Sequence, residues 1–302
     1  MSTLAETGRK QMSNRIKEPF SRRLFLKINV VILLLVSVLM LYPVIYVISS
    51  SLSSEQAILQ GRVFLWPVAP HLKAFEKVFV YPNLLTSYRN TVVYTVAGTL
   101  LNLFLTTCGA WALCQRKMPG RRFLTLMCTF TMFFSGGMIP TFLVVKELGM
   151  LDSIWAMLLP GAVSTYNMIL MRTFFQNIPS SLTEAAELDG CNDFGILFRI
   201  VLPLSLASLM TIGMFYAVAH WNGYFNAMLY LSTPEKFPLQ IILRQVVLES
   251  QIVENSSSAT DSNMAEGIKY ATIVVAMVPM LCVYPFVQRY FVKGVMIGSV
   301  KE

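Results

Sequence analysis

Six long apolar segments limit what this 302-residue chain can fold into. Each approaches or exceeds the ~20 residues that a helix needs to cross about 30 Å of hydrocarbon. Charged residues make up only 13% of the chain, against about 25% in soluble domains. We therefore predict an all-α, polytopic membrane protein with six transmembrane helices in residues 28–291. The predicted spans are Ile28–Ser50, Thr91–Leu113, Phe123–Val145, Ile154–Phe174, Leu204–Leu231 and Tyr270–Phe291.

Basic residues flank these segments unevenly and predict their orientation. The tail formed by residues 1–27 contains seven lysines and arginines, and the connection Gln115–Arg122 contains four bases and no acid. The positive-inside rule then places the tail, residues 292–302 and the connections after the second and fourth spans in the cytoplasm. The connection Arg62–Arg89 carries four bases and would lie outside, against the rule, but the N-terminal tail outweighs it. The seven tail residues are Arg9, Lys10, Arg15, Lys17, Arg22, Arg23 and Lys27.

The first apolar segment is too long for the hydrophobic region of a signal peptide, so we interpret it as a retained anchor. The net charge of +8 does not indicate a nucleic-acid partner. The basic residues adjoin apolar spans, where they report topology and contact with anionic lipid. The five cysteines form no CxxC pair, which disfavours a metal site or a disulfide framework and favours small buried side chains.

The connection formed by residues 175–203 is acidic where the orientation predicts a basic cytoplasmic linker. The run Ser181–Glu184 fits a capping box, which predicts a helix beginning near Ser181. Asp189 and Gly190 predict its end and a tight turn. A second, apolar helix should follow and join the fifth span at Pro203. We expect the first helix to present a small-residue face, formed by Ala185 and Ala186, to a partner.

The spacing of this segment resembles the EAA motif of ABC importer permeases: Glu184-Ala185-Ala186, three residues, Gly190, nine residues, Ile200, one residue, Leu202-Pro203. The resemblance implies a type I ABC importer permease fold with a coupling helix that docks on a separate ATPase subunit. Glu184 would then be the charged contact; the alternative is that it only closes the capping box, and the two roles can coexist. The coupling residues that the resemblance implies are Glu184, Ala185, Ala186, Asp189, Gly190, Ile200, Leu202 and Pro203.

Other runs are similar to the maltose-type subfamily of carbohydrate permeases, namely Trp221-Asn222 and Gln288–Gly294. The run Ser135–Pro140 resembles a branch that includes permeases for uronic-acid-containing oligosaccharides. The resemblance implies a bacterial cytoplasmic-membrane importer with four kinds of partner: a second homologous permease, an ATPase dimer, an extracytoplasmic solute-binding protein and an oligosaccharide. ATP and Mg²⁺ would bind the ATPase subunits, and this chain would bind no cofactor.

Polar residues inside the spans suggest a substrate path, because they are costly there. The candidates mix amides with aromatic rings, as sugar sites do, but the amides could equally form interhelical hydrogen bonds. Gly136 and Gly137 could line the same path or form a close helix contact. Prolines at 140, 160, 279 and 285 could kink their helices. The path candidates are Asn167, Trp221, Asn222, Tyr224 and Asn226, with His220, Ser164 and Tyr166 beside them.

The longest outward connection, residues 232–269, contains a polar run at Glu254–Glu266 that we expect to be a mobile loop. The chain carries no GxxxxGK[ST], HExxH or GxSxG motif, so we predict no enzyme, and any ATPase must be another chain. An ion-gradient-driven secondary transporter is the alternative, but it predicts intramembrane charges or inverted repeats, and neither is evident. A membrane-embedded enzyme is the third hypothesis.

Overall fold

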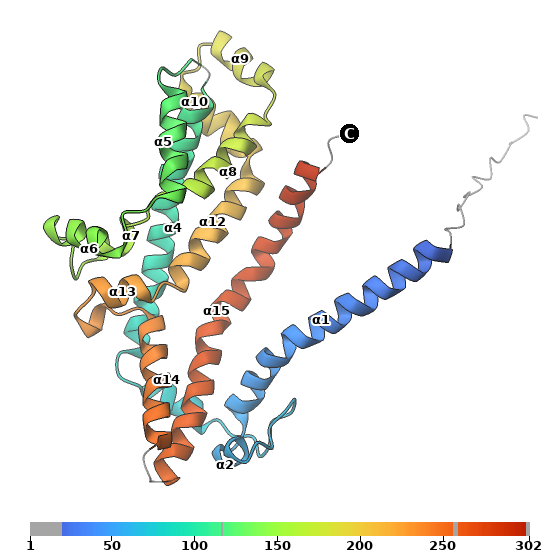
Figure 1. The fold of residues 1–302 in the computed structure, drawn as a ribbon, viewed down its shortest axis with the longest axis vertical. Helices are drawn as coiled ribbons and strands as arrows, with labels where there is room; N and C mark the ends of the chain where they lie inside the picture. The colour runs from blue at the N-terminus through green and yellow to red at the C-terminus, as the bar shows by residue number, and fades with distance from the viewer. Residues whose placement is uncertain (1–19, 116, 256–258, 300–302) are drawn as a thin grey trace, which may run out of the picture.

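The computed structural model describes residues 20–115, 117–255 and 259–299, and the regular elements in these ranges are helices (Figure 1). The predicted all-α class is confirmed for this part of the chain. The basic residues before Phe20, and Arg116, lie outside it. The short helices that connect or extend the longer ones are α2 (Glu55–Leu59), α3 (Lys73–Val80), α7 (Ile154–Leu158), α13 (Phe225–Tyr230) and the 3-10 turn η2 (Pro234–Lys236).

Three helices are long and apolar enough to cross a membrane: α1 (Phe20–Leu52), α4 (Leu84–Cys114) and the stretch Glu266–Pro285 of α15 (Ala259–Ser299). Two bent pairs raise the total in the described residues to five if each pair is one span. The predicted fourth span, Ile154–Phe174, is divided into α7 and α8 (Thr165–Gln176). Six continuous spans are therefore not observed, because three of the predicted spans are interrupted.

The first bent pair consists of α5 (Arg121–Phe133) and α6 (Met138–Glu147), whose axes meet at 115°. The bend lies at the glycine run rather than at Pro140, which stands in the first turn of α6. Gly137 has a φ of +87°, and a Cβ added there would meet nothing within 4 Å. Neither a kink at Pro140 nor a close helix contact at Gly137 is therefore found. The glycine provides the backbone conformation of the break.

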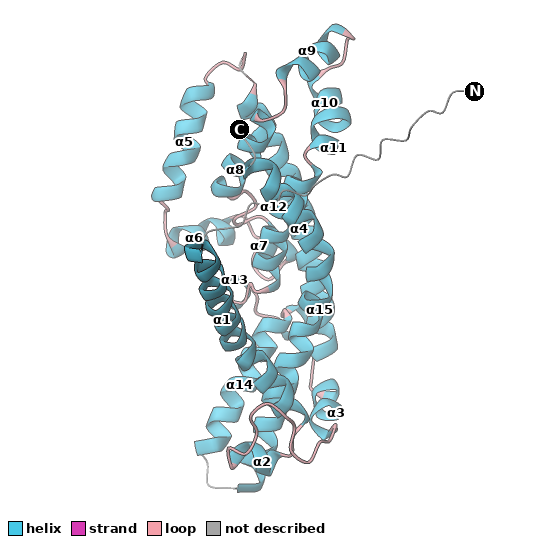
Figure 2. Cartoon of the chain, turned by 90° about the vertical axis from the view of Figure 1, so that its right-hand side faces the viewer, coloured by secondary structure: helices cyan, strands magenta, loops and turns pink. Residues whose placement is uncertain are grey.

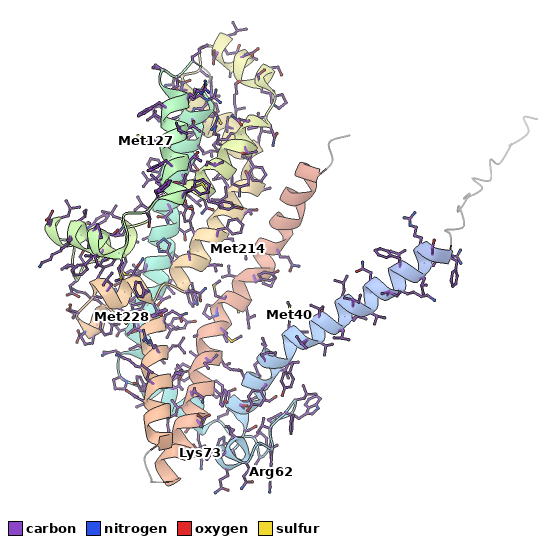
Figure 3. The ribbon with its side chains drawn as sticks, viewed as in Figure 1. Met40, Arg62, Lys73, Met127, Met214 and Met228 are labelled. Atoms are coloured by element: carbon purple, nitrogen blue, oxygen red, sulfur yellow. The ribbon has the colours of Figure 1, made fainter. Side chains whose placement is uncertain are left out.

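The packed core differs from the exposed helices around it. α4 packs along α12 (Leu206–Trp221) and α8, and α15 packs against α12 and α14 (Leu239–Asn255). By contrast, α1 has no buried residue before Ser49, and Met40 projects freely from it in Figure 3. An apolar helix with so much exposed surface has to be covered by lipid or by another membrane subunit.

The mobile loop predicted at Glu254–Glu266 is not found in the described part of that run, because α14 extends to Asn255 and α15 begins at Ala259, and residues 256–258 lie outside the described residues. Leu239, Ile242 and Val246 follow helical spacing and are buried against α15, which makes α14 a packed amphipathic helix. At the same end, the Tyr81 hydroxyl donates to Glu249 at 3.0 Å. Burial, together with this hydrogen bond, raises the pKa of Tyr81 to about 12.

The two ends of the bundle carry different elements. The helix α9 (Ser180–Leu188) lies at one end with the start of α5, and α2, the end of α14 and the start of α15 lie at the other (Figure 1). The C-terminal part of α15 also runs toward the α9 end (Figure 1). The acidic connection and the long 232–269 connection are therefore on opposite ends of the molecule.

Candidate functional site

The acidic connection forms a short helix that stands at the end of the bundle. α9 begins at Ser180, and the preceding Pro179 offers no side-chain cap. The predicted capping box is therefore wrong: Ser181 lies inside the helix, and the Thr183 hydroxyl donates to the Ser180 carbonyl at 2.9 Å. Glu184 is consequently free of a capping role and lies on the exposed surface of α9.

The end of α9 is a Schellman turn built on Gly190, which has a φ of +80°. The Cys191 amide donates to the Ala186 carbonyl at 3.0 Å, and the Gly190 amide donates to the Glu187 carbonyl at 3.1 Å. Cys191 also packs with Ala186 at the edge of the core, as this motif commonly does. The predicted stop and tight turn at Gly190 are confirmed.

A second helical segment leads from this turn into α12. The Asn192 side chain caps α10 (Asp193–Ile196) by accepting from the Gly195 amide at 2.7 Å. A π-helical turn, Leu197–Val201, and the short α11 (Leu202–Leu204) follow. Pro203 has no N–H to donate to the carbonyl four residues earlier, which explains why the α-helical bonding pattern is lost just before it. The segment Asp193–Leu204 meets α12 at 86°.

The motif residues divide between the exposed surface and the core. Glu184, Ala185, Asp189, Gly190 and Pro203 are exposed. Ala186 is only 7% exposed and packs into the core of this chain. The predicted small-residue face is therefore reduced to Ala185, because Ala186 points inward.

The remaining motif positions anchor the segment. Ile200 and Leu202 pack against the core that contains Leu197 and Val201. The most exposed apolar side chain on α9 is Leu188, at 89% exposure, and the motif did not single it out. Its only sequence signal was its place at the last position of α9, one residue before the acidic turn.

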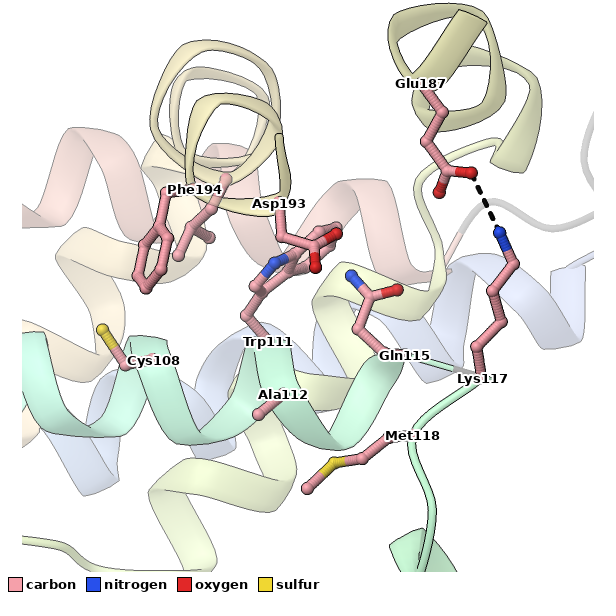
Figure 4. A pocket seen from close by; sticks show the side chains of 10 residues that line it. Cys108, Trp111, Ala112, Gln115, Lys117, Met118, Glu187, Asp193 and Phe194 are labelled. Atoms are coloured by element: carbon pink, nitrogen blue, oxygen red, sulfur yellow. Dashed lines mark hydrogen bonds and ion pairs between the residues drawn. The ribbon is translucent and has the colours of Figure 1, made fainter. Parts of the chain in front are cut away.

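A cavity of about 620 Å³ separates α9 and α10 from the end of α4 (Figure 4). Across it, the Lys117 ammonium contacts the Glu187 carboxylate at 3.1 Å. Both side chains are largely exposed, so this pair contributes at most about 1 kcal/mol to stability. The contact nevertheless joins the connection after α4 to α9.

A second, polar cavity of about 280 Å³ lies deeper in the bundle, where α4, α7, α8, α12 and α13 meet. Its lining mixes amide, hydroxyl and imidazole groups with apolar side chains, and none of its lining residues is a lysine, arginine, aspartate or glutamate. Such groups can hydrogen-bond the hydroxyl groups of a ligand. The polar lining residues are Asn102, Ser164, Asn167, Tyr216, His220 and Asn226.

Hydrogen bonds hold this lining in place. His220 Nε2 lies 3.0 Å from the side chain of Asn102. With the Asn102 amide oxygen toward the imidazole, its nitrogen donates to the Gly98 carbonyl at 2.9 Å and the Ala162 carbonyl at 3.3 Å. The Tyr216 hydroxyl lies 2.7 Å from Thr106 Oγ1 and accepts from the Ser164 amide at 3.0 Å. The interhelical hydrogen-bond role that the sequence left open is therefore found for His220, and it coexists with a cavity.

The five predicted path residues are not gathered in one place. Asn167 and Asn226 line the polar cavity, whereas Trp221 is 6% exposed and stacks edge-to-face on Tyr88 in a different core. Trp221 therefore does not line this cavity, and its assignment to the path stays a prediction.

Asn222 and Tyr224 are exposed and do not line the cavity. The Asn222 side chain donates to the Val218 carbonyl of its own helix, and the Tyr224 ring faces the Arg244 guanidinium at 5.2 Å. The sequence missed Asn102, because one amide within a long apolar run gave no pattern.

An aspartate clamp fixes the helices that close the cavity. Asp152, between α6 and α7, accepts from the Ser232 and Thr233 amides, from the Thr233 hydroxyl at 2.6 Å and from the Lys236 ammonium at 2.7 Å. The Asp152 amide donates to the Tyr230 carbonyl at 2.8 Å. The clamp thus ties α7 to α13, and these helices contribute Met157 and Asn226 to the cavity.

The clamp predicts a dependence of stability on pH. The hydrogen bonds from Lys236, Thr233 and Ser232 hold the pKa of Asp152 well below its usual range. A carboxyl group with a lowered folded-state pKa stabilises the fold above its unfolded pKa of about 3.9, and this stabilisation is lost as the pH falls through the folded pKa. We expect Asp152→Asn to lower the melting temperature at neutral pH, and the difference from the wild type to shrink below about pH 4.

Melting curves of the purified protein across this pH range measure the effect. Glu147→Gln is the matched control, because Glu147 is exposed at the end of α6. Equal melting temperatures for Asp152→Asn and the wild type at neutral pH would show that the clamp does not stabilise the fold.

Within the described residues, no group of three or more histidine, cysteine or acidic side chains is arranged to hold a metal ion. The site is thus an exposed helix joined to a polar cavity. Residues 106–297 match the family described as binding-protein-dependent transport system inner membrane component.

Two relatives come from Bacillus subtilis. The polygalacturonan/rhamnogalacturonan transport system permease protein YtcP is 46% identical over 276 residues, which cover 89% of this chain and 95% of that protein. Protein LplC is 42% identical over 281 residues, which cover 92% of this chain and 95% of that protein.

A solved structure is similar over nearly the whole chain. It is a chain of a bacterial ABC transporter involved in the import of the acidic polysaccharide alginate, with a TM-score of 0.82 and 39% identity. The match covers 91% of this chain and 99% of that chain. The chain therefore belongs to the family of binding-protein-dependent transport system inner membrane components, and the prediction of an importer permease subunit is confirmed.

Proposed function

We propose that this chain is one of two permease subunits of a bacterial cytoplasmic-membrane importer that takes up an oligosaccharide at the expense of ATP. The observation that carries the proposal is the continuous path from exposed α9 to α12, which lines the polar cavity. ATP and Mg²⁺ bind a separate ATPase dimer, and α9 is the coupling helix that contacts it. This chain contributes no catalytic group.

The proposed topology has six spans, three of them interrupted. The α5–α6 pair, α7 with α8, and Asp193–Leu204 with α12 are the interrupted ones, beside α1, α4 and α15. The basic connection at residues 115–122 lies at the α9 end, which supports a cytoplasmic position for α9 and both tails. Residues 232–269, with α14, then lie outside, where a solute-binding protein delivers the sugar.

Packing gives α9 the means to transmit a displacement. The turn at Gly190 is fixed by two hydrogen bonds, and Ala186, Ile200 and Leu202 pack on one core with α4 and α8. A push on Glu184, Ala185 and Leu188 from closing ATPase subunits therefore moves a rigid unit rather than a loose loop. That unit continues into α12, whose Tyr216 and His220 line the cavity.

The lining of the cavity supports a sugar as the cargo. Amide and hydroxyl groups hydrogen-bond sugar hydroxyls, and Phe215 adds an aromatic ring at the same cavity. The names of the relatives mention polygalacturonan, rhamnogalacturonan and the acidic polysaccharide alginate, so uronic-acid-containing oligosaccharides are the first class to test. The path residues that we now propose are Asn102, Ser164, Asn167, Tyr216, His220 and Asn226.

The coupling role is tested by Leu188→Asp. Leu188 is 89% exposed and makes no core contact, so the variant should fold normally. If α9 docks on the ATPase, a buried aspartate at the contact should weaken the affinity for the ATPase about 30-fold, as expected for loss of a residue worth about 2 kcal/mol. Co-purification of the ATPase with the variant measures this loss. Glu184→Lys should weaken it as well.

Leu148→Asp serves as the matched control, because Leu148 is 65% exposed but lies just after α6, away from α9. The control should retain the ATPase at the wild-type level. Normal ATPase retention and normal uptake by both α9 variants would refute the coupling assignment.

A further inference from the structure

A third cavity, of about 700 Å³, lies between the start of α5 and the side of α8. Three guanidinium groups and two hydroxyl groups from two helices converge on it, and no acidic side chain lines it. The transport mechanism above uses none of these residues. The polar lining consists of Arg121, Arg122, Thr125, Thr129 and Arg172.

The cations of this arginine pocket are not neutralised by the chain. Among the described residues, no carboxylate forms an ion pair with Arg121, Arg122 or Arg172. Arg172 Nη1 donates to Thr125 Oγ1 at 3.4 Å, but its Nε is buried and has no partner. A buried charged donor without an acceptor is costly. A ligand that offers oxygen acceptors would remove that cost.

The beginning of α5 adds further donors at the same place. α5 runs for 13 residues from Arg121, and no side chain caps its first amides, while Gly120 in front of it lines the arginine pocket. Free amides and the helix dipole favour an anion at such a terminus. Three arginines and a helix start therefore specify a ligand with a compact negative group, such as a phosphate.

Exposed apolar side chains of α5 beside the arginine pocket indicate which class of phosphate-bearing ligand fits. α5 has no buried residue and stands apart from the rest of the bundle in Figure 2. Leu126 lines the arginine pocket and is 68% exposed, and Phe123 and Phe130 are exposed beside it. A small soluble anion has no apolar part that could cover this surface, but the acyl chains of a lipid can lie along it.

We propose that the arginine pocket binds the phosphate head group of an anionic phospholipid, with the acyl chains against α5. The pocket lies at the α9 end, so the lipid comes from the leaflet that the proposed topology makes cytoplasmic. The bound lipid fills the gap between α5 and α8 and ties together two helices that have few contacts of their own.

The proposal is tested on the complete importer, reconstituted in nanodiscs of phosphatidylcholine with a fixed fraction of phosphatidylglycerol. Native mass spectrometry after mild detergent extraction counts the retained lipids. We expect the wild type to retain phosphatidylglycerol in preference to phosphatidylcholine. Arg122→Gln should lower this preference about fivefold, and Arg172→Gln should lower it about tenfold or more. Arg122 is exposed, so its loss should not disturb folding.

Arg199→Gln is the control, because it removes an equal charge from an exposed position outside the pocket. A wild-type preference in this control, with a lost preference in the pocket variants, supports the proposal. An unchanged preference in both pocket variants, or an equal loss in the control, overturns it. A separate arm adds inorganic phosphate or galacturonate to importer in phosphatidylcholine alone. If either raises the melting temperature as much as phosphatidylglycerol does, and only when the arginines are present, the ligand is a soluble anion and the lipid proposal fails.

Discussion

A Gly190→Val variant should lose most of the ATP hydrolysis that the solute-binding protein stimulates, while its transmembrane core remains folded. Gly190 has a φ of +80°, a conformation that costs an ordinary residue about 1–2 kcal/mol and a β-branched residue more. The Schellman turn that orients α9 would then rearrange, since it depends on this residue. A strain of that size corresponds to a change of about 5–30-fold in a conformational equilibrium, and we expect stimulated hydrolysis to fall by a similar factor.

Gly190→Asn separates the conformational effect from the effect of adding a side chain. Asparagine tolerates the left-handed region, and nothing lies within 4 Å of the added Cβ, so this variant should keep most of its activity. The measurement is ATP hydrolysis by the reconstituted importer with and without its binding protein. Equal activity of the valine and asparagine variants would mean that the turn does not set the position of α9.

Gly98→Ala should destabilise the polar cavity by about 1–3 kcal/mol, although it adds a single methyl group. A Cβ at Gly98 would stand 2.4 Å from His220 Nε2 and 2.5 Å from Cε1. The imidazole lies between α4 and α12 and is bonded to Asn102, so it moves away only by breaking that bond. We expect a lower melting temperature and a weaker uptake of substrate.

A double-mutant cycle tests this cause. His220→Ala removes the ring that the new methyl group would strike, so Gly98→Ala should cost much less in the His220→Ala background. Gly136→Ala is the control glycine substitution, because its nearest neighbour would lie 4.0 Å away. If Gly98→Ala destabilised the His220→Ala background as much as the wild type, a clash with the imidazole would not be the cause.

Local backbone chemistry explains which predictions about helix ends and breaks agree with the structure. The turn at Gly190 was predictable, because a left-handed residue after a run of helix formers is decided within a few residues. The capping box failed because Pro179, two residues before the predicted start at Ser181, precedes a helix that begins at Ser180. The sequence offered a kink at Pro140, but the third span bends at the glycine run that ends with Gly137, since a proline in the first turn of a helix disturbs nothing.

The residues that line the polar cavity were only partly predictable from the sequence. Polarity within an apolar run singled out Asn167 and Asn226, which line the cavity, but it could not distinguish them from Trp221, which turns toward Tyr88. Asn102 and Arg172 gained their roles only because α4 meets α12 and α5 meets α8. Contacts between helices that are distant in the sequence have no local pattern to reveal them.

The sequence by itself determined a helical membrane protein, the motif of an importer permease and the position of the turn at Gly190. These follow from apolar length, charge distribution and backbone preference, all of which act within one segment. The tertiary structure decided that Ala186 points inward while Leu188 points outward, and that three predicted spans are interrupted. It also decided which polar groups share a cavity. The reason is physical: a side chain's neighbours depend on how separate helices pack, and the free energy of that packing is shared among all of them.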